Sequence, residues 1–198
     1  MNLLTTISMA MGASWVSGIN LYATVATLGL LSRFSGLHLP GDLSALTNWW
    51  IIGFALGLYV VEFVADKVPW IDSGWDLIHT FIRIPAGAVL AAGAFGGFDK
   101  GVQVVALLLG GGLALSSHGT KATTRAFLNL SPEPVTNIIA SVIEDITAIG
   151  SILLAAFFPV LLIIVVVIGV VISIIIVPRL FGYFRAAIRK LKGKPHPA

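Results

Sequence analysis

The sequence predicts an all-α integral membrane protein with about six transmembrane helices. Of its 198 residues, 57% are hydrophobic and only 11% are charged, whereas a soluble domain carries about 25% charged residues. The mean hydropathy is +0.98, and apolar stretches recur at lengths close to the thickness of a bilayer core. Since the chain has too few charges to cover a surface in water, a single membrane-embedded domain is the expected class.

Six apolar stretches define the expected spans, and Pro and Gly mark most of the turns between them. The spans are expected at about residues 5–31, 49–64, 75–95, 102–129, 135–157 and 160–177, with a loop over 33–48 and turns over 68–76, 96–101 and 130–134. A single helix over 135–177 would be about 64 Å long, twice the thickness of the membrane. A tight hairpin at Pro159 is therefore expected.

Two units of unequal size are expected. Residues 1–177 form the transmembrane domain, and residues 178–198 form a basic amphipathic helix at anionic headgroups. Within the domain, residues 1–97 and 101–177 resemble two three-helix repeats, each with a polar stripe and a pair of acids. Three spans per repeat make the second repeat inverted, which is typical of transporters. The alternative is that a six-span chain resembles two halves by chance.

Polar residues follow one face of the first span and one face of the fifth. The first face carries Ser17, Asn20 and Thr24, and the second carries Asn137 and Ser141. Such a stripe either packs against another helix or lines a cavity, and both interpretations stay open on this evidence.

Four acidic residues lie within spans or at their ends, where charge is costly. Glu62 and Asp66 are one turn apart at the end of the second span, and Glu144 and Asp145 are adjacent in the fifth. Because neighbouring carboxylates cannot all ionise cheaply, the four are candidates for proton or cation coupling. The alternative is a static ion-pair network that holds the helices together.

The basic residues Arg83, His118, Lys121 and Arg125 are expected near the cytoplasmic face, where they are candidates for binding an anion or a lipid headgroup. The alternative is the ordinary excess of positive charge on that face. Pro85 follows Arg83 closely. The third span is therefore expected either to break there or to let Arg83 extend to the headgroups.

Enzyme signatures are sparse. The chain has no cysteine, which excludes disulfides and thiolate metal sites, and it has no HExxH, P-loop or GxSxG motif. Asp72, Asp76 and His79 are the residues with which an intramembrane enzyme would hold a metal, although so few ligands are a weak signal. No cofactor is expected. Half of the basic residues lie in the tail, so no nucleic-acid-binding face is expected.

Five segments together resemble a family of small bacterial multi-span membrane proteins that is catalogued as a domain of unknown function. The segments are GINLYATVATLGLL, EFVADKVPWIDSGWD, RIPAGAV, KATTRAFLNLSPEP and SVIEDITA. The resemblance covers roughly residues 12–177 and leaves out the basic tail. It implies a bacterial inner-membrane protein with several spans, and it implies no reaction, ligand or catalytic residue.

Two functions from different classes follow from these patterns. The first is a small transporter or a lipid or anion translocator, coupled to protons or cations, with membrane lipids and an anionic or lipid substrate as partners. The second is a membrane scaffold or accessory subunit that transports nothing. A homo-oligomer is expected in either case. The basic tail predicts a cytoplasmic C-terminus, and six full spans place the N-terminus on the same side.

Overall fold

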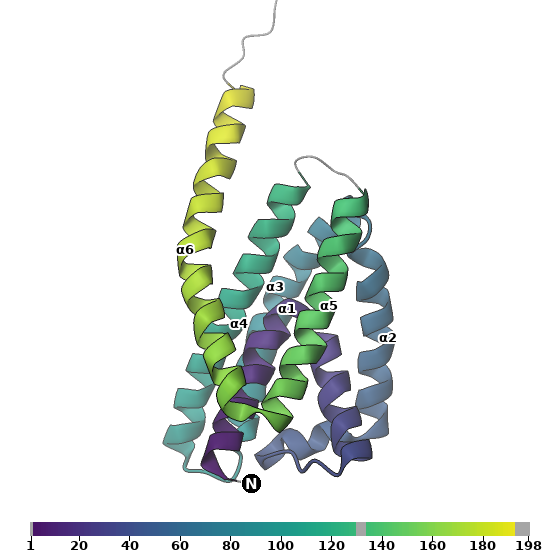
Figure 1. Cartoon of the computed structure of the whole chain (residues 1–198), viewed down its shortest axis with the longest axis vertical. Coiled ribbons are helices and arrows are strands. Elements are labelled where there is room, and N and C mark those ends of the chain that lie inside the picture. Colours follow the sequence, from purple (N-terminus) through teal and green to yellow (C-terminus); the bar gives the residue numbers. More distant parts are fainter. Residues whose placement is uncertain (1, 130–133, 193–198) are drawn as a thin grey trace, which may run out of the picture.

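The computed structural model describes residues 2–129 and 134–192, and every long element in this part of the chain is a helix. The elements, in chain order, are α1 (Leu3–Ser35), the short 3₁₀ helix η1 (Gly41–Thr47), α2 (Trp49–Ala65), α3 (Pro69–Ala94), α4 (Lys100–Leu128), α5 (Pro134–Phe157) and α6 (Pro159–Lys192). They form one bundle with α1 at its centre (Figure 1). The predicted all-α class is confirmed.

Five of the helices in the described residues are long and apolar enough to cross a membrane: α1, α3, α4, α5 and α6. The helix α2 is long and apolar enough to span a membrane when it is taken together with η1, from which it is bent by 73°. The chain is therefore a multi-span membrane protein. In the apolar stretch of α1 that is long enough to span a membrane, 72% of residues are buried inside the protein, compared with 17% in the corresponding stretch of α6. The first helix is thus the core around which the others pack, and α6 mainly faces lipid.

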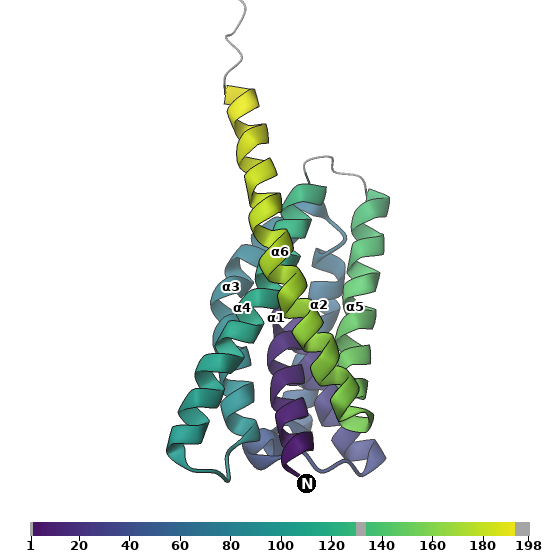
Figure 2. The ribbon, with the colours of Figure 1, turned by 60° about the vertical axis from the view of Figure 1, so that its left-hand side comes forward.

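The first helix does not cross the bundle. Its backbone leaves the helical region at Asn20 (φ −147°, ψ 99°), and the chain then turns back, so that both ends of α1 lie at the same end of the molecule (Figures 1 and 2). Contacts agree with this path. Near the start, Ser8 donates a hydrogen bond to the carbonyl of Ala155, at the end of α5, and near the end Phe34 packs edge-on against Trp49, at the start of α2.

We call residues 3–19 the first arm and residues 21–35 the second arm of this re-entrant helix pair, with Asn20 at its tip. Because α1 returns to the end where it starts, the described N-terminus and the end of α6 lie at opposite ends of the bundle (Figure 2). The expectation that six full spans bring both termini to one side is therefore wrong. Non-helical backbone at membrane depth is tolerated where protein surrounds it. Here the five helices α2 to α6 all pack against α1.

The structure also decides where several of the helices begin, end or continue. The helix α3 begins at Pro69 rather than after a long turn, because proline suits the first turn of a helix. It then continues through Pro85 without a break. The hairpin near Pro159 is confirmed, since α5 ends at Phe157 and α6 returns beside it (Figure 1). The helix α6 continues through Pro178. The predicted turn at 130–133 and the side chains of the tail from residue 184 lie outside the described residues.

The first arm packs closely on α4 through glycine. A Cβ atom added to Gly18 would collide with the Ala114 carbonyl, the Ser117 side chain and the backbone of His118, whereas one added to Gly112 meets nothing within 4 Å. We expect Gly18→Ala to lower the free energy of unfolding by about 1–3 kcal/mol, as overpacking does. Gly112→Ala, in α4, is the matched control. Thermal unfolding of the two purified variants checks this, and equal midpoints would contradict the close contact.

Candidate functional site

Among the residues that the structure describes, nine ion pairs join eight buried or half-buried residues into one network, which we call the charge cluster. Its members come from α2, α3, α4 and α5 and from the turn after α2: Glu62, Asp66, Asp72, Asp76, Arg83, Lys121, Arg125 and Glu144. The cluster lies in the half of the bundle toward which α6 rises, and the re-entrant pair fills the other half (Figure 1).

Arg83 anchors the cluster on α3. Its guanidinium lies 2.6 Å from Glu62 and 3.2 Å from Asp76, and its side chain is completely buried. It also approaches the Gly18 carbonyl at 3.5 Å, near the end of the first arm of α1. Arg83 therefore does not extend to the headgroups. It neutralises two carboxylates inside the bundle and faces the negative end of a helix dipole.

Two basic residues of α4 complete the network. Lys121 lies 3.1 Å from Asp66, 3.2 Å from Glu144 and 3.5 Å from Glu62. Arg125 binds Glu144 through two parallel hydrogen bonds, of 2.9 and 2.8 Å, a strong and directional arrangement. Lys121 and Arg125 share one face of α4, and so they connect α2 with α5 through their ion pairs.

Carboxylates outnumber the basic groups that neutralise them. The cluster holds five carboxylates and three basic side chains. In four of the five acids, one oxygen has no hydrogen-bond partner among the described residues, and these acids are Glu62, Asp66, Asp72 and Asp76. All four are at most 4% exposed. An ionised carboxylate without a partner is costly when it is buried, so the arrangement favours bound protons or bound cationic groups.

Asp72 lies at the outer edge of the cluster, before the stretch Gly74–Ala94 that is apolar enough to span a membrane. It accepts a hydrogen bond from the side chain of Asn129 at 3.2 Å, and Asn129 in turn accepts one from Asn137. Burial raises the pKa of Asp72 to about 6, although Arg125 opposes the shift. Burial therefore favours the protonated form of this carboxyl group more than water does for a free aspartate.

The tip of α1 lies beside the charge cluster. The Asn20 side chain accepts a hydrogen bond from the Ala23 backbone N–H at 2.8 Å, which caps the second arm, and it donates one to Asp145 at 3.1 Å. The other oxygen of Asp145 has no partner among the described residues. The positive end of the second arm therefore lies beside a carboxylate, and the negative end of the first arm lies beside Arg83.

Two of the chain's four histidines, His79 and His118, link α3 to α1 and to α4. His79 contacts Tyr22 through one ring nitrogen and the Trp75 carbonyl through the other, and His118 pairs with Thr80. Among the described residues, no three His, Asp or Glu side chains are arranged to hold a metal ion. The predicted metal group of Asp72, Asp76 and His79 is not assembled, because both aspartates belong to the charge cluster.

The five predicted cavity-lining residues make different contacts in the structure. Ser17 and Thr24 are fully buried and donate hydrogen bonds to carbonyls of their own helix, so they support the shape of α1. Asn20 and Asn137 bind cluster residues or their neighbours. The hydroxyl of Ser141 is buried without a partner among the described residues.

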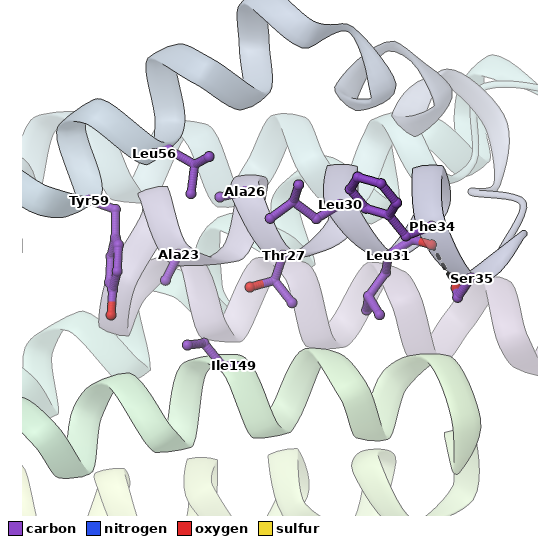
Figure 3. Close-up of a pocket in the computed structure, with 10 residues that line it drawn as sticks. All are labelled: Ala23, Ala26, Thr27, Leu30, Leu31, Phe34, Ser35, Leu56, Tyr59 and Ile149. Carbon is purple, nitrogen blue, oxygen red and sulfur yellow. Dashed lines mark hydrogen bonds between the residues drawn. The ribbon is translucent and has the colours of Figure 1, made fainter.

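An apolar groove leads toward Asp145 from the opposite end of the bundle. Its outer part, about 470 Å³ in volume, is lined by the second arm of α1, by Leu56 and Tyr59 of α2, and by Ile149 of α5 (Figure 3). An adjoining part of about 390 Å³ shares Tyr59 and Ile149 and is lined by Asp145 as well. The groove thus runs between α2 and α5 and ends at a carboxylate next to the tip of α1.

The chain belongs to the family described as "Domain of unknown function (DUF4126)", which matches residues 7–179. This confirms the family resemblance drawn from the sequence. No curated protein matches the chain, and no solved structure matches it.

Proposed function

We propose that this member of the DUF4126 family is a small proton-coupled membrane transporter, with the coupling proton held in the charge cluster. The observation that carries the proposal is the excess of buried carboxylates over basic groups, with unpartnered oxygens on four of them. Ionisable groups inside a membrane protein are expensive and mark ion pathways and proton relays. A cluster that can take up and release protons is the chemistry that coupling needs.

The break in α1 supports the same proposal. Many transporters form their sites from discontinuous helices, whose free ends point at the transported groups. Here the two arms end at Asn20, between Asp145 on one side and Arg83 on the other. The tip of the re-entrant pair contacts ionisable groups directly, so a change in their protonation acts on the backbone at the bend.

The cluster favours a positively charged substrate over the anion suggested by the basic residues alone. Arg83, Lys121 and Arg125 each lie within 3.2 Å of a carboxylate, and an anion would meet more negative than positive charge. The duplication of two three-helix repeats stays a prediction. The first helices of the two repeats differ, because α1 is broken at Asn20 whereas α4 runs unbroken from Lys100 to Leu128. A homo-oligomer also stays a prediction.

The second candidate is a membrane scaffold, and one observation favours it. Each basic residue of the cluster is already bound to carboxylates within the cluster, as expected of a static network that joins four helices. Buried ion pairs are nevertheless often no more stabilising than apolar residues of similar size. A purely structural role therefore leaves the carboxylate excess unexplained.

Proton flux in proteoliposomes separates the two candidates. With the membrane potential clamped, an imposed pH gradient is expected to collapse faster with the protein than in protein-free liposomes, as an internal pH-sensitive dye would report. Glu62→Gln should return the rate to that of protein-free liposomes. The control is Asp42→Asn, which changes an exposed acid outside the cluster. Equal rates with and without the wild-type protein would contradict the transporter and favour the scaffold.

We also propose that the end of α6 faces the cytoplasm in a bacterial inner membrane. Six of the twelve basic residues follow Val177, and such an excess marks the cytoplasmic side. The loop with η1 then lies outside, and the turn after α2 lies inside.

Cysteine labelling tests this orientation, because the natural chain has no cysteine. In intact cells, a membrane-impermeant maleimide is expected to label Ser44→Cys, in η1. Val68→Cys, in the turn after α2, should react only after the cells are opened. Both positions are exposed, so accessibility to the reagent depends on the side of the membrane. The reverse labelling pattern would invert the orientation.

A further inference from the structure

We propose that a lateral pocket between α1, α4, α5 and α6 binds an amphipathic organic cation that enters from the lipid. The pocket has a volume of about 640 Å³, which lies within the range of about 300–1,000 Å³ that small-molecule sites occupy. It lies on the other side of α5 from the apolar groove, and it reaches the charge cluster at Lys121 and Glu144.

The mouth of the pocket opens toward the membrane. The helices α5 and α6 are joined at Phe158 and diverge toward the end of the bundle where the cluster lies (Figures 1 and 2). The rim includes Ile143 of α5, which is 58% exposed, and Ile172 of α6, which is 44% exposed. Since these branched aliphatic side chains face acyl chains, a ligand with an apolar body reaches the pocket from within the bilayer.

The inner wall carries one hydrogen-bond donor without a partner among the described residues, beside hydroxyl groups that already donate hydrogen bonds within the protein. The indole N–H of Trp15 has no partner among the described residues, although the residue is only 8% exposed. Hydroxyl groups of Ser117, Thr120 and Ser173 line the same wall. A buried donor without a partner costs free energy, and a ligand with a hydrogen-bond acceptor would remove this cost.

The charge at the inner end selects a cation. The Glu144 side chain is 17% exposed, whereas the side chains of the other cluster acids are at most 5% exposed. Glu144 is therefore the carboxylate that a ligand in the pocket can reach. Lys121, which also lines the pocket, and Arg125 both bind Glu144. The cluster as a whole nevertheless holds five carboxylates and three basic groups, so a positive head gains net attraction and an anionic head meets net repulsion.

Binding of two matched probes to the protein in lipid nanodiscs tests the proposal. Tetraphenylphosphonium and tetraphenylborate are similar in size and shape and opposite in charge. The wild-type protein is expected to bind the phosphonium saturably, at one site, and not the borate. Glu144→Gln should weaken phosphonium binding about tenfold or more, as expected when a charged partner is lost.

A steric variant covers the case in which Glu144→Gln fails to fold. Thr147→Trp fills the pocket from a half-buried position on α5 that lines it, and it changes no residue of the charge cluster. It should weaken phosphonium binding by a similar factor. Ile139→Trp is the matched control, because Ile139 is exposed on the same helix and does not line this pocket. Its affinity should equal that of the wild type.

Equal binding of both probes, no saturable binding, or an unchanged affinity in Thr147→Trp would overturn the proposal. The experiment measures binding alone and does not need proton coupling. Phosphonium binding without proton flux in proteoliposomes would retain this site and remove the proposed transporter. Proton flux without phosphonium binding would do the opposite.

Discussion

Replacing Arg83 by leucine is expected to be among the most destabilising single changes in this protein. The substitution leaves Glu62 and Asp76 without the guanidinium that binds them at 2.6 and 3.2 Å. Removing one partner of a buried ion pair costs about 3–5 kcal/mol, because the two carboxylates stay buried and keep only the more distant Lys121, at 3.5 and 3.8 Å, to neutralise them. Thermal unfolding of the purified variant measures the loss.

Two further variants show whether the loss comes from the unpaired charge. The double variant Arg83→Leu with Glu62→Gln should recover part of the stability, since one of the two stranded carboxylates is then neutral. Arg33→Leu is the control for removing an arginine as such, because Arg33 is exposed and forms no ion pair with the described residues, where it binds the Thr47 carbonyl and lies over the Trp49 ring. A loss in Arg83→Leu no larger than that in Arg33→Leu would show that the cluster contributes little to stability.

Asn20→Ala is expected to disrupt the tip of the re-entrant pair and to abolish proton flux. The change removes the side-chain cap on the Ala23 N–H, which is worth about 0.5–2 kcal/mol. It also removes the hydrogen bond to Asp145, and a buried group left without a partner costs about 1–3 kcal/mol more. Unfolding in detergent and pH-gradient collapse in proteoliposomes measure the two effects on the same preparation.

Asn20→Ser separates the cap from the contact with Asp145. Serine is a good N-cap, but its side chain is too short to preserve the reach of asparagine. This variant should keep most of the stability and lose proton flux if the contact with Asp145 matters for coupling. Flux at the wild-type level in Asn20→Ser would assign Asn20 a purely structural role at the bend.

The positions of charged residues within apolar stretches of the sequence predict much of this site. Glu62, Asp66 and Glu144 stand out in the sequence because charge is rare and costly within apolar spans, and all three belong to the charge cluster. For Asp72 and Asp76 the sequence offers only a weak metal-site signal. Their true role follows once α3 begins at Pro69, since Asp72, Asp76 and Arg83 then lie on one helical face.

The path of α1 could not be predicted from local pattern. A stretch of 33 residues without an internal proline is typical of a long span, and at Pro85 the sequence leaves open whether α3 breaks or Arg83 extends to the headgroups. The helix α3 nevertheless continues through Pro85, and α1 bends at Asn20. The bend forms because the side chain of Asn20 replaces lost backbone hydrogen bonds and because Asp145 and Arg83 lie where the broken ends need them.

By itself, the sequence determined the membrane-embedded helical class, the position of most helices and the residues whose charge is costly at depth. These properties depend on composition and on spacing along one chain. Only the tertiary structure decided that acids and bases from four helices form a single network, that carboxylates exceed their basic partners in it, and that α1 turns back at Asn20. Those properties depend on which helices pack side by side, and the energy of a buried charge is set by its neighbours in space.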